Sequence, residues 1–132
     1  MQQLVGTTVR AVFMDKDTQH YILFRTNLGD FVFVASGDCC SESWFSAVNG
    51  LSALIDNKVT QAVEVDMGDV DDGRSRQEYD TLYRITLVTN RGACDIEFRN
   101  SSNGYYGGCV SDYGNSAPSD VTMERIEKDY TT

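Results

Sequence analysis

Apolar residues recur at every second position in several short runs of this chain, and turn-forming residues separate the runs. Near the N-terminus the apolar positions are Val9, Ala11 and Phe13, and residues 93–99 again alternate between apolar and charged side chains. A period of two indicates strands that present one face to a core and the other face to water. The chain is therefore expected to fold mainly into β-structure.

The remaining runs and the breaks between them divide the chain into elements. Helical spacing predicts a short helix at 40–48 and a turn at 52–55, and the helix is expected to bury Trp44 against the sheet. Residues 68–78 are polar and predict a loop, whereas 121–130 fit either an edge strand or a frayed helix. The predicted strands are 8–14, 20–26, 31–35, 58–66, 79–90, 93–99 and 105–113.

These elements predict an α+β, mainly β fold. We expect an antiparallel, strongly bent or partly closed sheet of about six or seven strands, with one short helix after the third strand. A length of 132 residues suits one globular domain, so residues 1–132 are assigned to a single domain. Residues 114–132 are expected to form a peripheral segment of that domain.

Negative charge dominates the chain and is unevenly distributed. The net charge is −9, with 20 acidic and 11 basic residues, and residues 56–80 alone contribute −5. Such a field repels phosphate backbones, which argues against general nucleic-acid binding and favours a partner with a basic surface. A solvated acidic loop without a binding role is the structural alternative. The predicted partner-binding residues are Glu64, Asp66, Asp69, Asp71 and Asp72.

The N-terminal sequence and the cysteines indicate a compartment. Residues 1–6 lack the basic region and apolar core of a secretory signal, and no run approaches the roughly 18 apolar residues of a membrane-spanning helix. We therefore expect a cytoplasmic protein. In that reducing compartment the four cysteines are expected to be free thiols rather than disulfides.

Cys39 and Cys40 are the candidate catalytic nucleophiles. Both lie at the start of the predicted helix, whose N-terminus can lower the pKa of a thiol. A nucleophile of this kind needs a general base, and His20 is the one histidine of the chain. The alternative is that both thiols pack as small apolar residues.

No motif predicts a metal or a cofactor, and none is expected. The cysteines form no CxxC pair, and the acidic run at 66–73 does not place its acids and glycine as a calcium loop requires. Phosphate-binding sequences of the GxGxxG or GKS/GKT type are absent.

Three tyrosines are the candidate ligand-binding residues. Tyr105, Tyr106 and Tyr113 lie in a glycine-rich segment and can form a stacking face for a nucleotide or another small molecule. The alternative is that they are ordinary edge and core aromatics, which their strand propensity favours.

Three blocks of sequence resemble a known family. Residues 4–6 read Leu-Val-Gly, residues 37–45 read Gly-Asp-Cys-Cys-Ser-Glu-Ser-Trp-Phe, and residues 95–108 contain Asp-Ile-Glu-Phe-Arg-Asn and Asn-Gly-Tyr-Tyr-Gly-Gly. The blocks are similar to an uncharacterised family of small domains that occur mostly in bacteriophage and prophage genomes. This resemblance implies a phage context, and it brings with it no activity and no site residues.

The charge, the resemblance and the lack of catalytic motifs together favour a non-enzymatic binding protein. We expect a small acidic accessory protein of phage type that engages a host protein through its acidic surface, and so inhibits a defence effector or a nuclease. It is expected to work in the bacterial cytoplasm and to bind neither membranes nor nucleic acids directly. Two other functions stay open: a small-molecule or nucleotide binder that uses the tyrosines, and an enzyme with a cysteine nucleophile.

Overall fold

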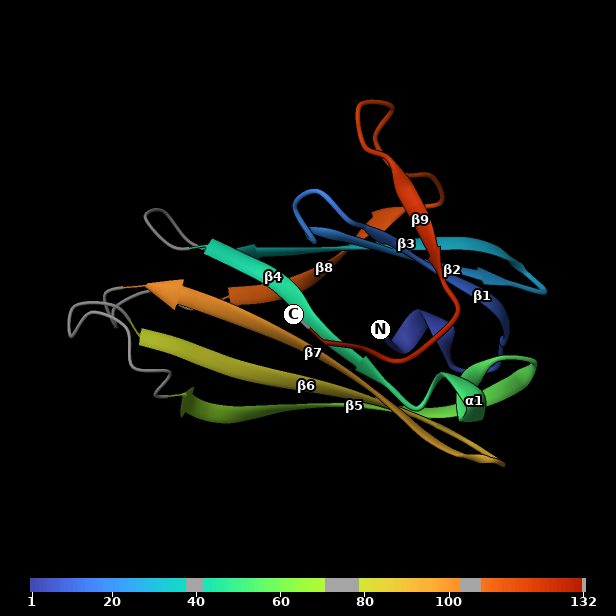
Figure 1. Cartoon of the computed structure of the whole chain (residues 1–132). Coiled ribbons are helices and arrows are strands. Elements are labelled where there is room, and N and C mark those ends of the chain that lie inside the picture. Colours follow the sequence, from blue (N-terminus) through green and yellow to red (C-terminus); the bar gives the residue numbers. More distant parts are fainter. Residues whose placement is uncertain (38–41, 71–78, 103–107, 132) are drawn as a thin grey trace.

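The computed structural model describes residues 1–37, 42–70, 79–102 and 108–131 and shows a mainly β chain (Figure 1). Within these residues the helical elements are the 3-10 turn η1 (Gln2–Leu4) and the short helix α1 (Leu51–Leu54). All the strand pairs among the described residues are antiparallel, as the sequence predicts. The strands are β1 (Thr8–Asp15), β2 (Tyr21–Thr26), β3 (Gly29–Gly37), β4 (Glu42–Asn49), β5 (Asn57–Val70), β6 (Tyr79–Thr89), β7 (Gly92–Ser102), β8 (Gly108–Gly114), β9 (Met123–Ile126) and β10 (Tyr130–Thr131).

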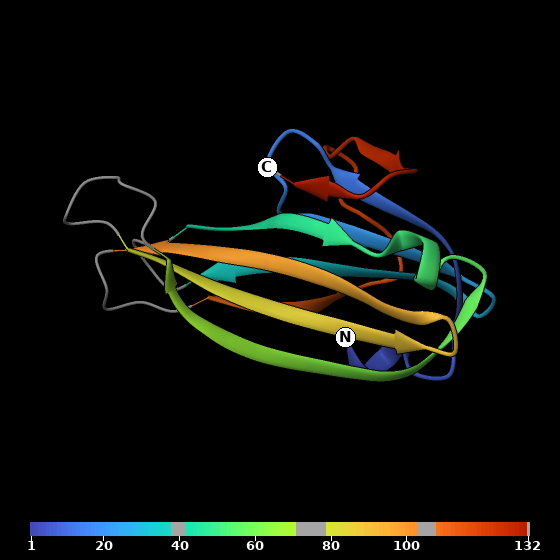
Figure 2. The ribbon, with the colours of Figure 1, turned by 60° about the horizontal axis from the view of Figure 1, so that its bottom comes forward.

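The ten strands of the described residues form one open sheet that is folded into two facing layers (Figures 1 and 2). Neighbouring strands follow the order β10-β4-β7-β6-β5-β1-β2-β3-β8, and β9 pairs with β1 outside this path. The predicted number of about six or seven strands is wrong, because β4 replaces the predicted helix and the C-terminal segment supplies β9 and β10. The sheet is strongly bent but is not closed.

One layer consists of β1, β2, β3, β8 and β9, and the other of β4, β5, β6, β7 and β10. Strand β1 joins the two layers. One edge of β1 pairs with β2. The other edge is shared, since β5 pairs with Thr8 and Val9 whereas β9 pairs with the stretch from Val12 to Asp15. Strand β5 therefore lies beside β1 for only two residue pairs and then continues into the other layer.

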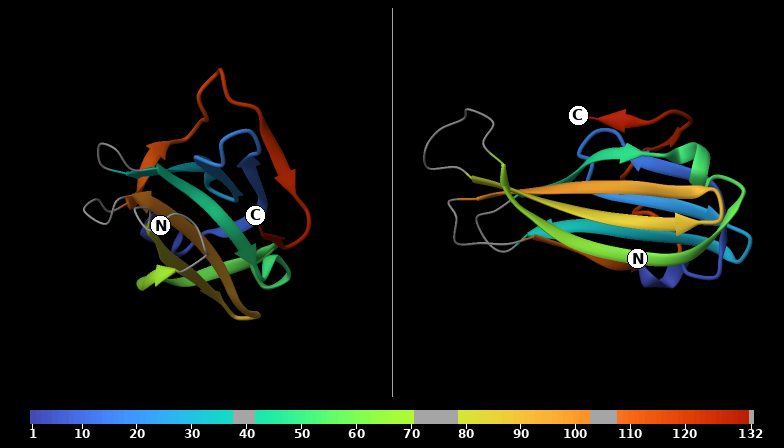
Figure 3. Two further views of the ribbon diagram at one scale, coloured as in Figure 1. Left: turned by 60° about the vertical axis from the view of Figure 1, so that its left-hand side comes forward. Right: turned by 90° about the horizontal axis from the view of Figure 1, so that it is seen from below.

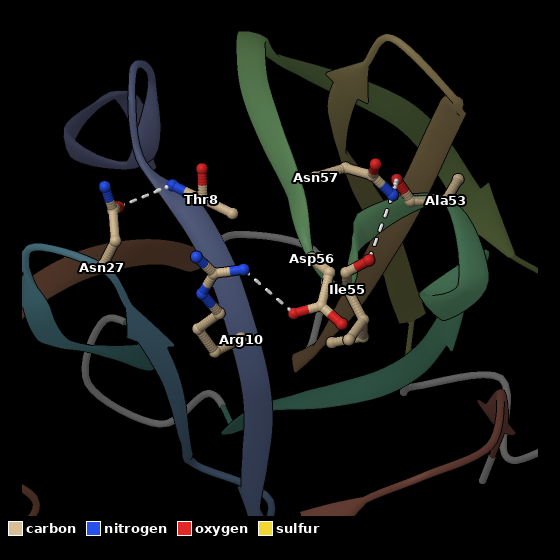
Figure 4. Close-up of polar contacts among 7 residues, drawn as sticks. All are labelled: Thr8, Arg10, Asn27, Ala53, Ile55, Asp56 and Asn57. Carbon is tan, nitrogen blue, oxygen red and sulfur yellow. Dashed lines mark hydrogen bonds and ion pairs between the residues drawn. The ribbon is translucent and has the colours of Figure 1, made fainter.

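Polar contacts fix this junction (Figure 4). Asp56, with a φ of +63°, donates its backbone N–H to the Val9 carbonyl at 2.7 Å. Its carboxylate pairs with the Arg10 guanidinium at 3.2 Å. The side-chain amide of Asn57 donates to two backbone carbonyls at the end of α1, at 3.0 and 3.1 Å. These contacts turn the chain sharply between α1 and β5 and place β5 against β1.

Residues 42–49 form strand β4 and not the predicted helix. The strand pairs along its length with β7, and a bulge between Phe45 and Ala47 shifts the register. The bulge brings Phe45 and Val48, three positions apart, onto the core face. This three-residue spacing imitates a helix in the sequence, but pairing with a distant strand decides the local structure. Trp44 consequently lies on the outer face of β4 and is only partly buried, not covered by a helix as predicted.

The C-terminal segment belongs to the sheet and to the core. Strand β9 pairs with β1, and β10 pairs with Ala47 and Val48 of β4. The side chain of Ile126 is buried, and Tyr130 packs against the core. Figure 3 shows the C-terminus on the β4 side of the molecule, whereas the N-terminal turn lies on the β5 side. Each of these two sides is therefore covered by a different end of the chain.

Aromatic side chains fill the space between the layers. Phe24 and Phe33 of one layer meet edge to face with ring centroids 5.8 Å apart. Phe45 and Phe98 of the other layer do the same at 6.4 Å. All four are fully or almost fully buried, so they are expected to be a main source of hydrophobic stabilisation.

Gly50 is expected to be the glycine least tolerant of substitution among those described. Its φ is +97°, and an added Cβ would lie 2.4 Å from the Ala93 carbonyl oxygen. Gly29 provides a matched control, because its φ is +114° but nothing lies within 4 Å of an added Cβ. Backbone strain alone should make Gly29→Ala cost about 1–2 kcal/mol. The additional clash should raise the cost of Gly50→Ala to roughly 3 kcal/mol or more. Urea denaturation measures both losses, and equal losses would contradict the close approach of Gly50 to β7.

Candidate functional site

The acidic residues of β5 lie at a sheet edge that has no neighbouring strand. Beyond Lys58, one edge of β5 pairs with β6, and no strand of the described residues pairs with the other edge. At that edge the side-chain amide of Gln2 donates a hydrogen bond to the Ala62 carbonyl. Because the backbone groups of alternate residues point to the same edge of a strand, Glu64 and Asp66 also present their N–H and C=O groups there. We call the stretch from Ala62 to Asp66 the free edge.

Side chains along the free edge alternate in chemistry. Three apolar side chains alternate along this part of β5: Val63 is 38% exposed, and Val65 and Met67 are each 46% exposed. Glu64 and Asp66 project from the opposite face of the strand and are exposed as well. The edge therefore offers apolar groups on one face and carboxylates on the other, beside backbone groups that no strand of the described residues pairs with.

No lysine or arginine of the described residues neutralises the negative charge of this edge. Glu64 and Asp66 form no ion pair in the described part of the chain, and Asp66 accepts a hydrogen bond from the backbone N–H of Gly68 at 2.8 Å. Burial lowers the pKa of the Met1 amino group, and the charges of Glu64 and of Asp112 on β8 partly oppose this shift. Acids from both layers thus lie on the same side of the molecule.

The other predicted partner-binding residues are described in part or not at all. Asp69 belongs to β5, and its backbone pairs with Thr81 of β6. Asp71 and Asp72 lie outside the described residues. The structure therefore assigns positions at the free edge to Glu64 and Asp66 alone.

A polar cleft lies where the turn between β1 and β2 meets the first residues of β4. The turn is fixed against β4 because the Gln19 carbonyl accepts a hydrogen bond from the Phe45 N–H at 2.8 Å. The cleft brings together the only histidine and the only tryptophan of the chain. Its volume is about 470 Å³, and its lining residues are Asp17, Thr18, Gln19, His20, Glu42, Trp44 and Ser101.

Two of the sequence blocks meet beside this cleft. Residues 42–49 pair with residues 95–101 on the neighbouring strands β4 and β7. Asn100 is fully buried and donates a hydrogen bond to the Ser43 hydroxyl at 2.9 Å, while its Oδ1 atom has no partner among the described residues. An added Cβ at Gly108 would lie 2.5 Å from the Ser43 oxygen. The blocks thus form one tightly packed unit. The sequence does not show this contact, because Ser43 and Asn100 are 57 positions apart.

The predicted tyrosine face is described at one of its three residues. Tyr105 and Tyr106 lie outside the described residues. Tyr113 lies on β8, is 46% exposed and meets Tyr21 edge to face, with ring centroids 5.2 Å apart. It is therefore an exposed aromatic residue that contacts Tyr21 of β2 across the intervening strand β3.

Two of the four cysteines are described, and both are free thiols in the structure. Cys94 is buried, and this burial, with smaller contributions from two aspartate charges, raises the pKa of its thiol to about 12. Cys109 is exposed. Cys39 and Cys40 lie outside the described residues, so their catalytic role stays a prediction. In the described stretches no group of three histidine, cysteine or acidic residues is arranged to hold a metal ion.

The two described thiols should differ strongly in reactivity. At pH 7 a thiol with a pKa near 12 is a thiolate in only about one molecule in 10⁵. In a variant with Cys39 and Cys40 replaced by serine, iodoacetamide should modify Cys109 within minutes and Cys94 only after unfolding. Mass spectrometry of the alkylated protein measures this order. The additional change Cys109→Ser should remove the fast reaction, and two fast sites in the native protein would contradict the burial of Cys94.

No helix among the described residues has the length and apolar character needed to cross a membrane. No curated protein and no solved structure matches the chain. Residues 2–111 match a protein family described as a domain of unknown function (DUF7448). The match covers η1, strands β1 to β7 and most of β8, including the free edge and the two sequence blocks that meet beside the cleft. The chain therefore belongs to the family described as a domain of unknown function, DUF7448.

Proposed function

We propose that this chain is a non-enzymatic binding protein that engages a positively charged protein through the free edge of β5. The observation that carries the proposal is the exposure of Glu64 and Asp66 at an unpaired edge, without a lysine or arginine partner in the described residues. Exposed carboxylates that lack internal partners contribute little to folding, whereas they accelerate association with a basic surface. Their placement therefore fits binding better than stability.

The charge of the whole chain supports this function. A net charge of −9 attracts a basic partner over a distance and repels nucleic acid. In the finer form of the proposal, the chain is a phage-type accessory protein in the bacterial cytoplasm. There it occupies the basic nucleic-acid groove of a host defence effector or nuclease and inhibits it. The support for this form is the charge complementarity and the resemblance to phage domains.

A second candidate function is the binding of a small polar molecule in the cleft at the start of β4. The observation in its favour is that His20 and Trp44 line one cleft together with the carboxylates of Asp17 and Glu42. An indole beside hydrogen-bonding groups suits a flat, polar ligand. Because Trp44 is the only tryptophan, a ligand in the cleft should change the tryptophan emission of the protein. Emission that stays constant across a ligand library, together with unchanged melting temperature, would argue against this function.

Removal of the two edge carboxylates should slow association without loss of stability. The double variant Glu64→Gln/Asp66→Asn should bind a basic host protein, captured on the immobilised chain at low salt, roughly tenfold more slowly at low ionic strength. The dependence of the association rate on salt should become flatter, because fewer charges steer the encounter. Its unfolding free energy should change by less than about 0.5 kcal/mol. Stopped-flow kinetics at two ionic strengths and urea denaturation measure these quantities.

The chain offers a control with the same change in charge. Glu124 and Asp120 are exposed and lie on the C-terminal segment, at β9 and before it. The variant Glu124→Gln/Asp120→Asn removes the same two kinds of side chain and should keep nearly the full association rate. Equal slowing by both double variants would show that only the net charge matters, and no slowing by the edge variant would refute the proposed function.

A further inference from the structure

We propose that the free edge binds its partner by strand addition, so that an extended segment with alternating basic and apolar residues becomes an additional antiparallel strand beside β5. This inference rests on the proposed function, because it concerns the same surface, and it adds the conformation and the sequence pattern of the partner.

The hairpin between β6 and β7 determines which backbone groups of β6 face β5. Thr89 and Gly92 are the last pair before a two-residue turn, and such a turn is closed by a hydrogen-bonded pair. Thr89 therefore directs its backbone N–H and C=O groups toward β7, and so does every second residue before it on β6. The residues between them, including Thr86 and Arg84, therefore face β5.

The pairing of β5 with β6 then shows which residues of β5 direct their backbone groups away from β6. Val63 pairs with Thr86 and Val65 pairs with Arg84, so Val63 and Val65 use their N–H and C=O groups within the sheet. Glu64 and the next alternate residue, Asp66, direct theirs outward. The hydrogen bond from Gln2 to the Ala62 carbonyl independently gives the same direction. Such outward groups are a template for one more strand.

The side chains define what that strand carries on each face. Glu64 pairs with Ile85 and Asp66 with Tyr83, which stacks on Phe98 with ring centroids 4.7 Å apart. Ile85 is buried, so the two carboxylates lie on the core face of the layer, at its open edge. Residues of an added strand directly opposite them would be about 5 Å away, and lysine or arginine there complements their charge.

The outer face of β5 favours apolar residues at the positions of the added strand that alternate with the basic ones. Val63 and Val65 are partly exposed there. The cation beside them, Arg84, is paired with Glu97 at 2.7 Å, so it does not repel a basic segment strongly. An added strand with valine or isoleucine at alternate positions extends this apolar surface and removes it from water. The preferred partner therefore alternates between basic and apolar residues.

The edge has defined limits. Gln2 of η1 occupies its beginning at Ala62, and an irregularity between Asp66 and Asp69 ends the regular register. The five residues from Ala62 to Asp66 span about 17 Å in an extended strand. A partner segment of five to seven residues is thus long enough, by this roughly 3.3 Å rise per residue.

A second copy of the chain fits this edge poorly. In an antiparallel pair of two β5 strands centred on Val65, Glu64 of each copy lies opposite Asp66 of the other. Like charges directly opposite each other destabilise a strand pair, and each copy also carries a net charge of −9. The charge of the edge therefore favours a basic partner over self-association.

Two N-methylated peptides test the backbone contribution at constant charge. The probe is a capped heptapeptide of alternating lysine and valine, and its dissociation constant is measured by fluorescence anisotropy at low salt. In the proposed register the lysine amides face β5 and the valine amides face away. N-methylation of the lysine amides should weaken binding at least tenfold, whereas N-methylation of the valine amides should change it less than about threefold. Equal effects of the two modifications would overturn strand addition.

Two substitutions at one position test the protein side. Glu64→Pro removes both the carboxylate and the outward N–H, whereas Glu64→Gln removes the carboxylate alone. Proline is tolerated at an edge where its nitrogen faces solvent, because no internal hydrogen bond is lost. Glu64→Pro should bind the unmodified peptide at least fivefold more weakly than Glu64→Gln does. Equal affinities would overturn the proposal, and the peptide pair keeps the test valid should the proline variant fail to fold.

The outcomes separate this inference from the proposed function. Should the variant Glu64→Gln/Asp66→Asn lose affinity while both methylated peptides bind alike, charge-driven binding would stand and strand addition would fall. Should that variant bind unchanged, the proposed function itself would fall. Sedimentation velocity tests whether a second copy of the chain occupies the edge instead. A dimer that forms at micromolar concentration and is lost in Glu64→Pro would assign the edge to a second copy and overturn the inference.

Discussion

The short overlap between the start of β5 and the start of β1 is the constraint on which the rest of the structure depends. Strand β5 pairs with β1 at Thr8 and Val9, and β9 takes the same edge from Val12 onward. Strand β5 begins at Asn57 opposite Val9 and runs antiparallel toward the start of β1 at Thr8, so it passes beyond β1 after two pairs. This departure opens the sheet into two layers, provides the space that the aromatic core fills, and leaves the later part of β5 without a neighbour on one side.

The features that make this edge a binding surface also protect it. Charged side chains on the core face and bulges are common devices that prevent open edges from aggregating, and β5 has both, with Glu64 and Asp66 between two irregularities in its register. Protection of this kind acts against copies of the same acidic chain. It does not act against a basic segment, for which the same carboxylates are attractive. One arrangement can therefore limit self-association and select the partner.

The sequence predicts the strands whose alternation is regular and misses those that depend on distant contacts. Residues 93–99 alternate strictly, and they form the central part of β7 with Cys94, Ile96 and Phe98 buried. The stretch 42–49 is wrongly predicted as a helix, because a bulge places Phe45 and Val48 on one face at a helical spacing. The bulge depends on pairing with β7, which local sequence does not show.

The candidate site is predicted in its chemistry but not in its geometry. The acidic character of Glu64 and Asp66 is visible in the sequence, whereas the free edge is not, since it results from the overlap of β5 with only the first two residues of β1. The cleft is hidden for a similar reason, because His20 and Trp44 meet only through the contact between the β1–β2 turn and β4. Local pattern reports which face of a strand is apolar, but it does not report which edges remain unpaired.

The most direct test of the account is the rate of amide hydrogen exchange along β5 in the free protein, followed residue by residue by NMR. Amides that bond to β6 should exchange slowly, and amides that face the free edge should exchange at nearly the rate of an unfolded chain. The account predicts slow exchange at Val63 and Val65 and fast exchange at Glu64 and Asp66. Slow exchange at all four residues would show that the edge is already paired and would contradict the central claim.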